Sequence, residues 1–234
     1  FSLLRPGASR SGEIAFFALI APSFSQALIR IDAQGVETVV ALQGALAPNT
    51  GGGTFSGFAL DRPAVNDAGQ VGFHGFVSGG SVANGLFLST GPVTSSVVLP
   101  GEAAPGTGGG SYGQPTMSPT LDGSGRVGFR NDLAGAGAGE GLFLETMAVD
   151  EEIALTGDDV PGLPSSVFDA FPTPPAQSPA GLVAFHATTA GTTVANGIWT
   201  VPEPVGGTLS TGILSLTLLA SGPGRRRGEG AAGA

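Results

Sequence analysis

Short apolar runs alternate with small or polar residues along the chain, and turn-forming residues separate them. In one such run, Val71 and Phe73 flank a glycine, so one face of an extended strand is bulky and the other is minimal. The preceding residues, 66–69, combine Asn and Asp, which cap turns with their own side chains, with a glycine that tolerates positive φ. This pattern predicts short β-strands joined by tight turns.

The same pattern returns at a nearly constant step, which indicates an internal repeat. A glycine opens each copy and a phenylalanine follows it by four positions; these glycines are Gly12, Gly69, Gly125 and Gly181. Successive copies are therefore 57, 56 and 56 residues apart. A proline precedes each glycine by six positions, namely Pro6, Pro63, Pro119 and Pro175. The shared register predicts structurally equivalent units with buried phenylalanines at Phe16, Phe73, Phe129 and Phe185.

Each unit contains enough apolar runs for four strands. In the unit that opens at Gly69 we expect a strand directly after this glycine, followed by strands over residues 85–89, 96–99 and 111–117. Four strands in about 56 residues resemble a β-propeller blade. We therefore predict an all-β, propeller-like array over residues 1–200, with a linear β-stack or a sandwich as the alternatives.

The number of units bears on whether such an array could close. Residues 1–6 match residues 58–63, so we expect the chain to begin at the end of a unit whose first part, with an export signal, lies upstream. About three and a half units would then be present, which makes an incomplete ring.

The repeat resembles a known bacterial family, the choice-of-anchor proteins built on an NxxGxxxF tandem repeat. Asn66, Gly69 and Phe73 match this motif in full. The other copies keep the glycine and phenylalanine but replace the asparagine, with Ser9, Asp122 and Ser178. The resemblance covers residues 1–200 and implies extracytoplasmic β-rich repeats; it implies no known activity.

The C-terminus resembles a second module, the PEP-CTERM sorting signal, over residues 201–227. Its first part is the sequence Val201, Pro202, Glu203 and Pro204. An apolar run that begins at Val205 and ends at Ala220 follows, and the basic cluster is Arg225, Arg226 and Arg227. The resemblance implies cleavage by an exosortase-type protease near the Pro-Glu-Pro sequence. Residues 228–234, which we expect to form a disordered tail, and several hydroxyl side chains in the apolar run depart from the family pattern.

The length of the apolar run favours a transient hold in the inner membrane. Its sixteen residues would reach roughly 24 Å as a helix, short of the ~30 Å hydrocarbon core. The basic cluster is typical of a cytoplasmic stop, which leaves the repeats outside. We therefore expect release to the cell surface or the extracellular matrix. The alternative is a final apolar strand followed by a disordered basic end.

Composition excludes several functional classes. The chain has nine arginines, no lysine and a net charge of −9, the opposite of what a protein that binds the nucleic-acid backbone needs. It has no cysteine, so disulfides and thiolate metal sites are excluded. The glycine runs at 51–53 and 108–110 lack the lysine and helix of a phosphate-binding loop and recur at the repeat step, so we expect turns.

The candidate catalytic side chains are explained more simply by the repeat. His74 and His186 each follow a repeat phenylalanine, at a position that holds Phe17 and Arg130 in the other copies, which indicates a variable strand site. Trp199 and Tyr112 replace phenylalanines, so we expect core packing.

The acidic candidates are predicted to be solvated turn residues. They are Glu102, Asp158, Asp159 and the run Asp150, Glu151 and Glu152. No calcium-loop motif is present, and we expect no catalytic residue, no cofactor and no metal site.

Two functions from different classes remain. The first is an exported surface or matrix protein with a structural or binding role, with an exosortase-type protease and exopolysaccharide or other matrix components as partners. The second is a secreted propeller-type enzyme or lectin that acts on glycans through loop carboxylates. Acids that break the repeat and converge in one place would favour the second; acids spread one per unit favour the first.

Overall fold

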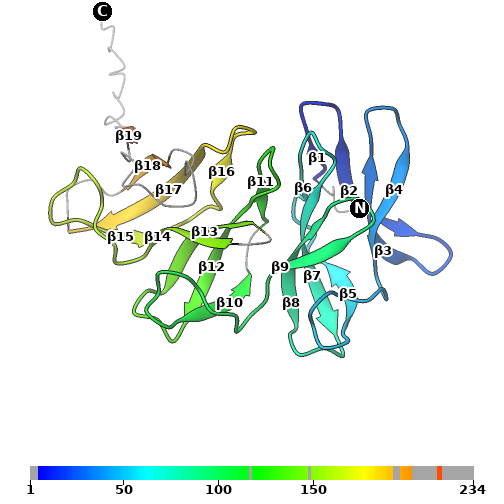
Figure 1. The fold of residues 1–234 in the computed structure, drawn as a ribbon, viewed down its shortest axis with the longest axis horizontal. Helices are drawn as coiled ribbons and strands as arrows, with labels where there is room; N and C mark the ends of the chain where they lie inside the picture. The colour runs from blue at the N-terminus through cyan, green and yellow to red at the C-terminus, as the bar shows by residue number, and fades with distance from the viewer. Residues whose placement is uncertain (1–4, 116–117, 147–148, 192–195, 202–214, 218–234) are drawn as a thin grey trace, which may run out of the picture.

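The computed structural model describes residues 5–115, 118–146, 149–191, 196–201 and 215–217. Regular structure in these residues consists of strands alone, arranged as four antiparallel sheets that follow one another along the chain (Figure 1). The prediction of an all-β protein is confirmed. The frequent Gly, Pro and Asn turns explain why the strands are short, because these residues end extended runs.

The sheets are named here in chain order. The first contains β1 (Gly7–Ala8), β2 (Ile14–Ile20), β3 (Ser25–Ile31) and β4 (Glu37–Leu42). The second contains β5 (Thr54–Phe58), β6 (Ala64–Val65), β7 (Val71–Ser78), β8 (Asn84–Ser89) and β9 (Thr94–Val98). The third contains β10 (Ser111–Pro115), β11 (Thr120–Leu121), β12 (Val127–Ala134), β13 (Glu140–Thr146) and β14 (Val149–Leu155). The fourth contains β15 (Val167–Ala170), β16 (Ala176–Gln177), β17 (Val183–Ala190), β18 (Asn196–Val201) and β19 (Ser215–Thr217).

The second, third and fourth sheets share one strand order. In the second sheet the order is β5-β7-β8-β9, and the short strand β6 pairs with the other half of β7. The third and fourth sheets repeat this arrangement with the short strands β11 and β16. In the first sheet the short strand β1 pairs with β2 in the same register, Gly7 opposite Ala15 as Ala64 lies opposite Gly72.

One predicted strand belongs to a different sheet from the one expected. Residues 111–117 were predicted to end the unit that opens at Gly69, but β10 pairs with β12 in the third sheet, with Tyr112 opposite Leu133. The reason is aromatic packing: the Tyr112 ring lies edge-on to Phe143, with ring centroids 5.0 Å apart. A strand therefore pairs with the sheet whose core its aromatic residue completes.

Equivalent aromatic side chains form the core of the last three sheets. The stacked pairs are Phe73–Phe87, Phe129–Phe143 and Phe185–Trp199, with centroids 5.7, 5.7 and 6.1 Å apart. A third ring from the first strand of each sheet meets the pair edge-on, and these rings are Phe55, Tyr112 and Phe168. The predicted core packing of Trp199 and Tyr112 is confirmed, with exposures of 0% and 1%.

Adjacent sheets pack face to face in chain order. The aromatic face of the third sheet lies in one buried cluster with Leu86 and Leu88 of the second sheet. In the same way Leu142 and Leu144 of the third sheet pack with the aromatic face of the fourth. Each sheet is thus held by the aliphatic side of the sheet before it, and these buried contacts are the dominant stabilising contribution.

The first sheet departs from this arrangement, and the predicted burial of Phe16 is wrong. Phe73, Phe129 and Phe185 are 0–2% exposed, but Phe16 is only half-buried, because its face of the first sheet is not covered by another sheet among the described residues. Its neighbours on that face, Ile14 and Val39, are 39% and 54% exposed. Phe17 is buried instead, stacked on Phe58 at 5.6 Å.

Candidate functional site

The four short strands β1, β6, β11 and β16 come together along one side of the molecule, at the top of Figure 1. Contacts join β1 to β6, β6 to β11 and β11 to β16. These strands and the turns around them line a groove of about 490 Å³ to which all four sheets contribute. We call it the short-strand groove.

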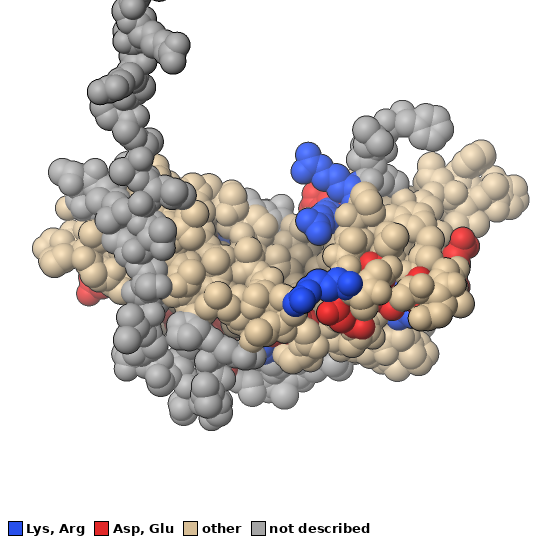
Figure 2. All heavy atoms as spheres, turned by 90° about the horizontal axis from the view of Figure 1, so that it is seen from above, with Lys and Arg blue, Asp and Glu red and all other residues tan. Residues whose placement is uncertain are grey.

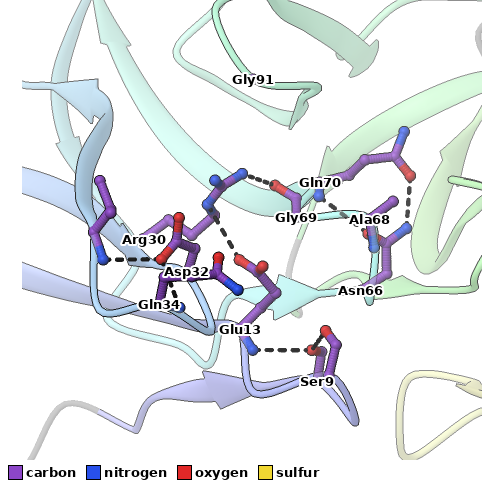
Figure 3. Close-up of polar contacts among 12 residues, drawn as sticks. Ser9, Glu13, Arg30, Asp32, Gln34, Asn66, Ala68, Gly69, Gln70 and Gly91 are labelled. Atoms are coloured by element: carbon purple, nitrogen blue, oxygen red, sulfur yellow. Dashed lines mark hydrogen bonds and ion pairs between the residues drawn. The ribbon is translucent and has the colours of Figure 1, made fainter.

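Each turn that lines the short-strand groove is built by the first residue of the repeat motif. The Asn66 Oδ1 atom accepts hydrogen bonds from the main-chain N–H groups of Ala68 and Gln70, at 3.1 and 3.0 Å (Figure 3). Asp122 accepts equivalent bonds from Ser124 and Arg126, both at 2.9 Å. An acceptor on a short side chain is therefore what this position requires, which explains why Asn, Asp and Ser alternate there.

The glycine of the motif closes the same turns. Gly12, Gly69, Gly125 and Gly181 have φ angles of 96°, 73°, 95° and 87°, a region that other residues adopt at a cost. The first residue and the glycine of the motif thus have one local explanation, the geometry of the turn that enters the central strand.

Hydrogen bonds also tie each turn to the turn of the next sheet. The Asn66 Nδ2 atom donates to the Asp122 main-chain oxygen at 2.8 Å, and the Ser11 N–H donates to the Asp67 carboxylate at 2.9 Å. The Gly123 N–H donates to the Pro179 oxygen at 3.0 Å. The turns therefore stack in a column, and this column forms the wall of the short-strand groove.

Two arginines are the basic side chains of the groove lining. Arg10 and Arg62 both line it and both are exposed, and neither forms an ion pair with any residue that the structure describes. Seen from above, most of the visible basic side chains gather near the middle of the molecule (Figure 2). By contrast, Arg30 pairs with Glu13 at 3.3 Å and Arg126 with Asp122 at 2.7 Å.

The acids of the groove are engaged in the turns. The Ser11 main-chain N–H lowers the pKa of Asp67 below its usual value. Burial by itself would raise the pKa of Asp122, but hydrogen bonds from Arg126 and Ser124 outweigh it and the net shift is downward. Both carboxylates thus stay ionised while they hold the groove wall.

Gln177 of β16 adds an unused hydrogen-bond donor to the groove lining. Its Oε1 atom accepts from the Gly128 N–H at 3.0 Å and from the Thr120 hydroxyl at 2.7 Å. Because a main-chain N–H can only donate, the amide oxygen is the atom that faces Gly128. The Nε2 atom is left buried, without a partner among the described residues.

A second group of polar residues lies between the second and third sheets. It consists of Glu102, Tyr112, Glu145 and Asp150. Burial raises the pKa of Glu145 to about 9, and the charges of Asp150 and Glu102 add to this shift. Burial and the same acids also raise the pKa of Tyr112. We call these four residues the acidic group.

The acidic group departs from the repeat pattern. Glu145 pairs with Asp150 across β13 and β14, where Ser89 and Thr94 form the equivalent pair of the second sheet. The prediction that the acids from Asp150 to Glu152 are turn residues is wrong, since they belong to strand β14 and are partly buried. The charged side chains of this strand hide the alternation of apolar and polar positions that would predict it from the sequence.

Glu102 and Asp158, in contrast, have the expected turn role. The Glu102 carboxylate accepts the Leu99 N–H and the Asp158 carboxylate accepts the Leu155 N–H, both at 2.7 Å. Asp158 nevertheless lies close to Glu152, whose pKa is raised by burial first and by Asp158 second.

The histidines occupy equivalent positions in different sheets and are not brought together. His74 in β7 lies opposite Leu86, and His186 in β17 lies opposite Ile198. Burial lowers the pKa of His74, against an opposing influence of Asp61. Among the described residues there is no group of three or more His, Cys, Asp or Glu side chains placed to hold a metal ion.

The predicted sorting signal lies largely outside the described residues, including Pro202, Glu203, Pro204 and the basic cluster from Arg225 to Arg227. Val201 is the last residue of β18, buried and paired with Val183. Within the apolar run, β19 (Ser215–Thr217) pairs with β18 at the edge of the fourth sheet. In the described part of the chain, no helix is long and apolar enough to cross a membrane.

Sequence reasoning missed the short-strand groove and its arginines. The short strands have two residues each, too few for an alternating pattern to reveal them. The proline that precedes each short strand recurs at the repeat spacing and could have revealed these strands. Proline in a sheet is confined to edge strands, strand starts and bulges.

Comparison with known proteins gives a family but no activity. No curated protein and no solved structure matches the chain. Residues 6–206 match the model of a family of unknown function, DUF7453, which spans all four sheets except β19. The protein therefore belongs to the DUF7453 family.

Proposed function

We propose that this protein is an exported, surface- or matrix-associated β-repeat protein that binds a ligand in the short-strand groove and carries a C-terminal sorting signal. One observation carries the binding role: four sheets place an equivalent short strand against one groove of about 490 Å³. Repeat proteins use surfaces shared among their units for recognition, because neighbouring units build them by simple stacking.

The repeat units of this proposal are propeller-like and form an incomplete ring. Support comes from the common strand order of the last three sheets and from the contacts among the short strands, which bring one edge of every sheet together. The face around Phe16, Ile14 and Val39 is covered by no sheet among the described residues, which supports an open array, since the equivalent faces of the other sheets are covered.

The sorting role rests on the sequence from Val201 to Pro204. Because Val201 ends β18, cleavage directly after it would leave β18 and all preceding strands intact and would remove β19. The apolar run cannot occupy the edge of the fourth sheet and the bilayer together, so membrane insertion requires β19 to leave β18. This is consistent with a transient hold before release.

Mass spectrometry of the protein recovered from a host that contains an exosortase tests the sorting role. We expect a mature C-terminus between Val201 and Pro204, and an uncleaved chain when Pro202 and Glu203 are both replaced by Ala. A secreted mature chain that retains Arg225, Arg226 and Arg227, or purely cytoplasmic recovery, would overturn the proposal.

A second candidate function, a glycan-acting hydrolase, is favoured by the acidic group. A carboxyl with a raised pKa beside a second carboxyl group is the arrangement that glycosidases use for general acid catalysis. Here Glu145 would be the acid, and Asp150 or Glu102 its partner. None of these residues lines the short-strand groove, however, so we propose a non-catalytic binding role. Hydrolysis of any glycan that is lost in Glu145→Gln would establish the second function instead.

A further inference from the structure

We propose that the short-strand groove binds an extended polyanion with widely spaced carboxylates, the chemistry of polysaccharides that contain uronic acids, through Arg10 and Arg62. This inference rests on the proposed binding role and names the class of its ligand. It does not depend on the sorting signal.

The charge of the two arginines is available to a ligand. The protein carries a net charge of −9, so acidic partners are plentiful, yet within the described residues Arg10 and Arg62 pair with none of them. The acids that line the same groove, Asp67 and Asp122, are held by hydrogen bonds of the turns. A guanidinium presents two parallel N–H donors that match a carboxylate.

The two arginines are too far apart for one small anion. The Ser11 N–H contacts the Asp67 carboxylate, so Arg10 lies beside this end of β6. Gly7 lies against Pro63 at the other end, because a Cβ atom on Gly7 would come within 2.1 Å of the Pro63 oxygen. Arg10 therefore lies opposite Asn66, about four residues after Arg62. Four residues of extended chain separate the two arginines by roughly 13 Å. An elongated ligand can reach both.

The rest of the groove lining suits a hydroxylated chain. Ser118 and Thr120 are partly exposed hydroxyl residues of this lining. Pro174, which is partly exposed, and Pro179, which is exposed, add apolar ring surfaces to the lining. Hydrogen bonds and apolar contact together are what a sugar ring with equatorial hydroxyls and C–H groups can use.

Nucleic acid, the other common polyanion, fits less well. DNA carries one charge per about 1.7 Å of duplex axis, and the surrounding acidic surface would repel so dense a row of phosphates. Single strands are usually held by stacking on aromatic side chains, and the residues described along the groove include none. A chain with widely spaced carboxylates can contact both arginines and is repelled less by the acidic surface than nucleic acid is.

Isothermal titration of the full chain with oligogalacturonate tests the proposal, and the methyl-esterified oligomer is the matched ligand without charge. We expect binding of the acid form at low salt that is at least about tenfold tighter than binding of the ester. The variant with Arg10→Ala and Arg62→Ala together should lose at least about tenfold in affinity. Arg5→Ala, which removes an exposed arginine that does not line the groove, should change affinity less than about twofold.

The outcomes separate this inference from the proposed function. Equal binding of acid and ester, or an unchanged affinity in the double arginine variant, would overturn the anionic class while the binding role stands. Tighter binding of single-stranded DNA than of oligogalacturonate would replace the glycan by nucleic acid. No binding of either oligomer or of DNA would overturn both the inference and the binding role of the groove. Thermal melting of each variant confirms that these exposed substitutions leave the fold intact.

Discussion

The side-chain amide of Asn66 donates a 2.8 Å hydrogen bond to the main-chain oxygen of Asp122, a residue 56 positions further along the chain. The two residues open the same turn in neighbouring sheets, so one side chain both builds its own turn and fixes the spacing to the next. At this motif position the side-chain oxygen therefore accepts hydrogen bonds within its own turn, and the side-chain nitrogen donates to the neighbouring sheet.

Replacing Asn66 separates these two roles. Asn66→Ala removes the acceptor of the turn and the donor to Asp122, so we expect a loss of about 2 kcal/mol in the free energy of unfolding. Asn66→Asp retains the acceptor and should lose about 1 kcal/mol. Denaturant unfolding of both variants provides the measurement. An equal loss in the two variants would show that the turn acceptor contributes nothing, and no loss in Asn66→Asp would show the same for the bond to the next sheet.

The same comparison explains what could be predicted from sequence. The turns could be predicted from the sequence because each needs particular residue types locally. The turn requires a side-chain acceptor at Asn66 and a positive φ at Gly69. The core phenylalanines followed from their register with these turns. Three of the four predicted positions, Phe73, Phe129 and Phe185, are fully buried.

Most of the errors concern contacts between units. Residues 111–117 were placed with the wrong sheet because strand pairing depends on which core Tyr112 joins, and spacing does not encode this. Phe16 was expected to be buried although burial requires a neighbouring sheet. The sequence predicts turn residues for the acids of β14 because their charge hides the alternation of the strand. The groove depends on four segments 56–57 residues apart and could not be seen in any one of them.

The core phenylalanines should differ sharply in their contribution to stability. Phe129→Ala leaves a cavity between two sheets and should cost about 3–5 kcal/mol, because the ring is fully buried against Tyr112 and Phe143. Phe16→Ala removes an equivalent but half-buried ring and should cost about 1 kcal/mol. Denaturation midpoints measured at one protein concentration test this. A cost for Phe16→Ala as large as that for Phe129→Ala would mean that the first sheet is covered in solution.

The acidic group should make the protein less stable as the pH rises. Folding raises the pKa of Glu145 from 4.5 to about 9, so the folded state binds a proton more tightly than the unfolded state between these values. The stability this proton provides is complete below pH 4.5 and is lost as the pH rises toward 9. Asp150, Glu102 and Tyr112 face the same region, and the raised pKa of Asp150 acts in the same direction.

Glu145→Gln isolates this contribution. The amide cannot ionise, so we expect the variant to be about 2 kcal/mol more stable than the parent at pH 8 and nearly equal to it at pH 4.5. Glu151→Gln, on the same strand but outside the acidic group, is the control and should not reproduce the gain at pH 8. Urea unfolding across this pH range is the measurement. A Glu145→Gln variant whose advantage shrinks as the pH rises would contradict the assigned shift.

Two glycines at equivalent positions should respond in opposite ways to the same substitution. A Cβ atom on Gly128 would lie 2.6 Å from the Thr120 hydroxyl oxygen and 2.7 Å from Gln177 Oε1, so Gly128→Ala must break the bonds that these side chains make. We expect a loss of about 1–2 kcal/mol in unfolding free energy. A Cβ atom on Gly72 meets its nearest neighbour, Pro119 Cγ, at an ordinary 3.5 Å. Gly72→Ala should be neutral or stabilise by about 0.5 kcal/mol, since alanine restricts the unfolded chain.

The sequence itself supports this contrast, because Ala15 and Ala184 occupy the equivalent position in the first and fourth sheets. The difference between the two glycines therefore comes from the neighbouring sheet: Gln177 reaches across from the fourth sheet to Gly128, while Pro119 beside Gly72 has no donor to lose. Thermal unfolding gives the stability of each variant, and titration with oligogalacturonate reports whether displacing Gln177 also weakens the groove. If Gly72→Ala were as destabilising as Gly128→Ala, close packing of the strand and not the Gln177 bridge would be the cause.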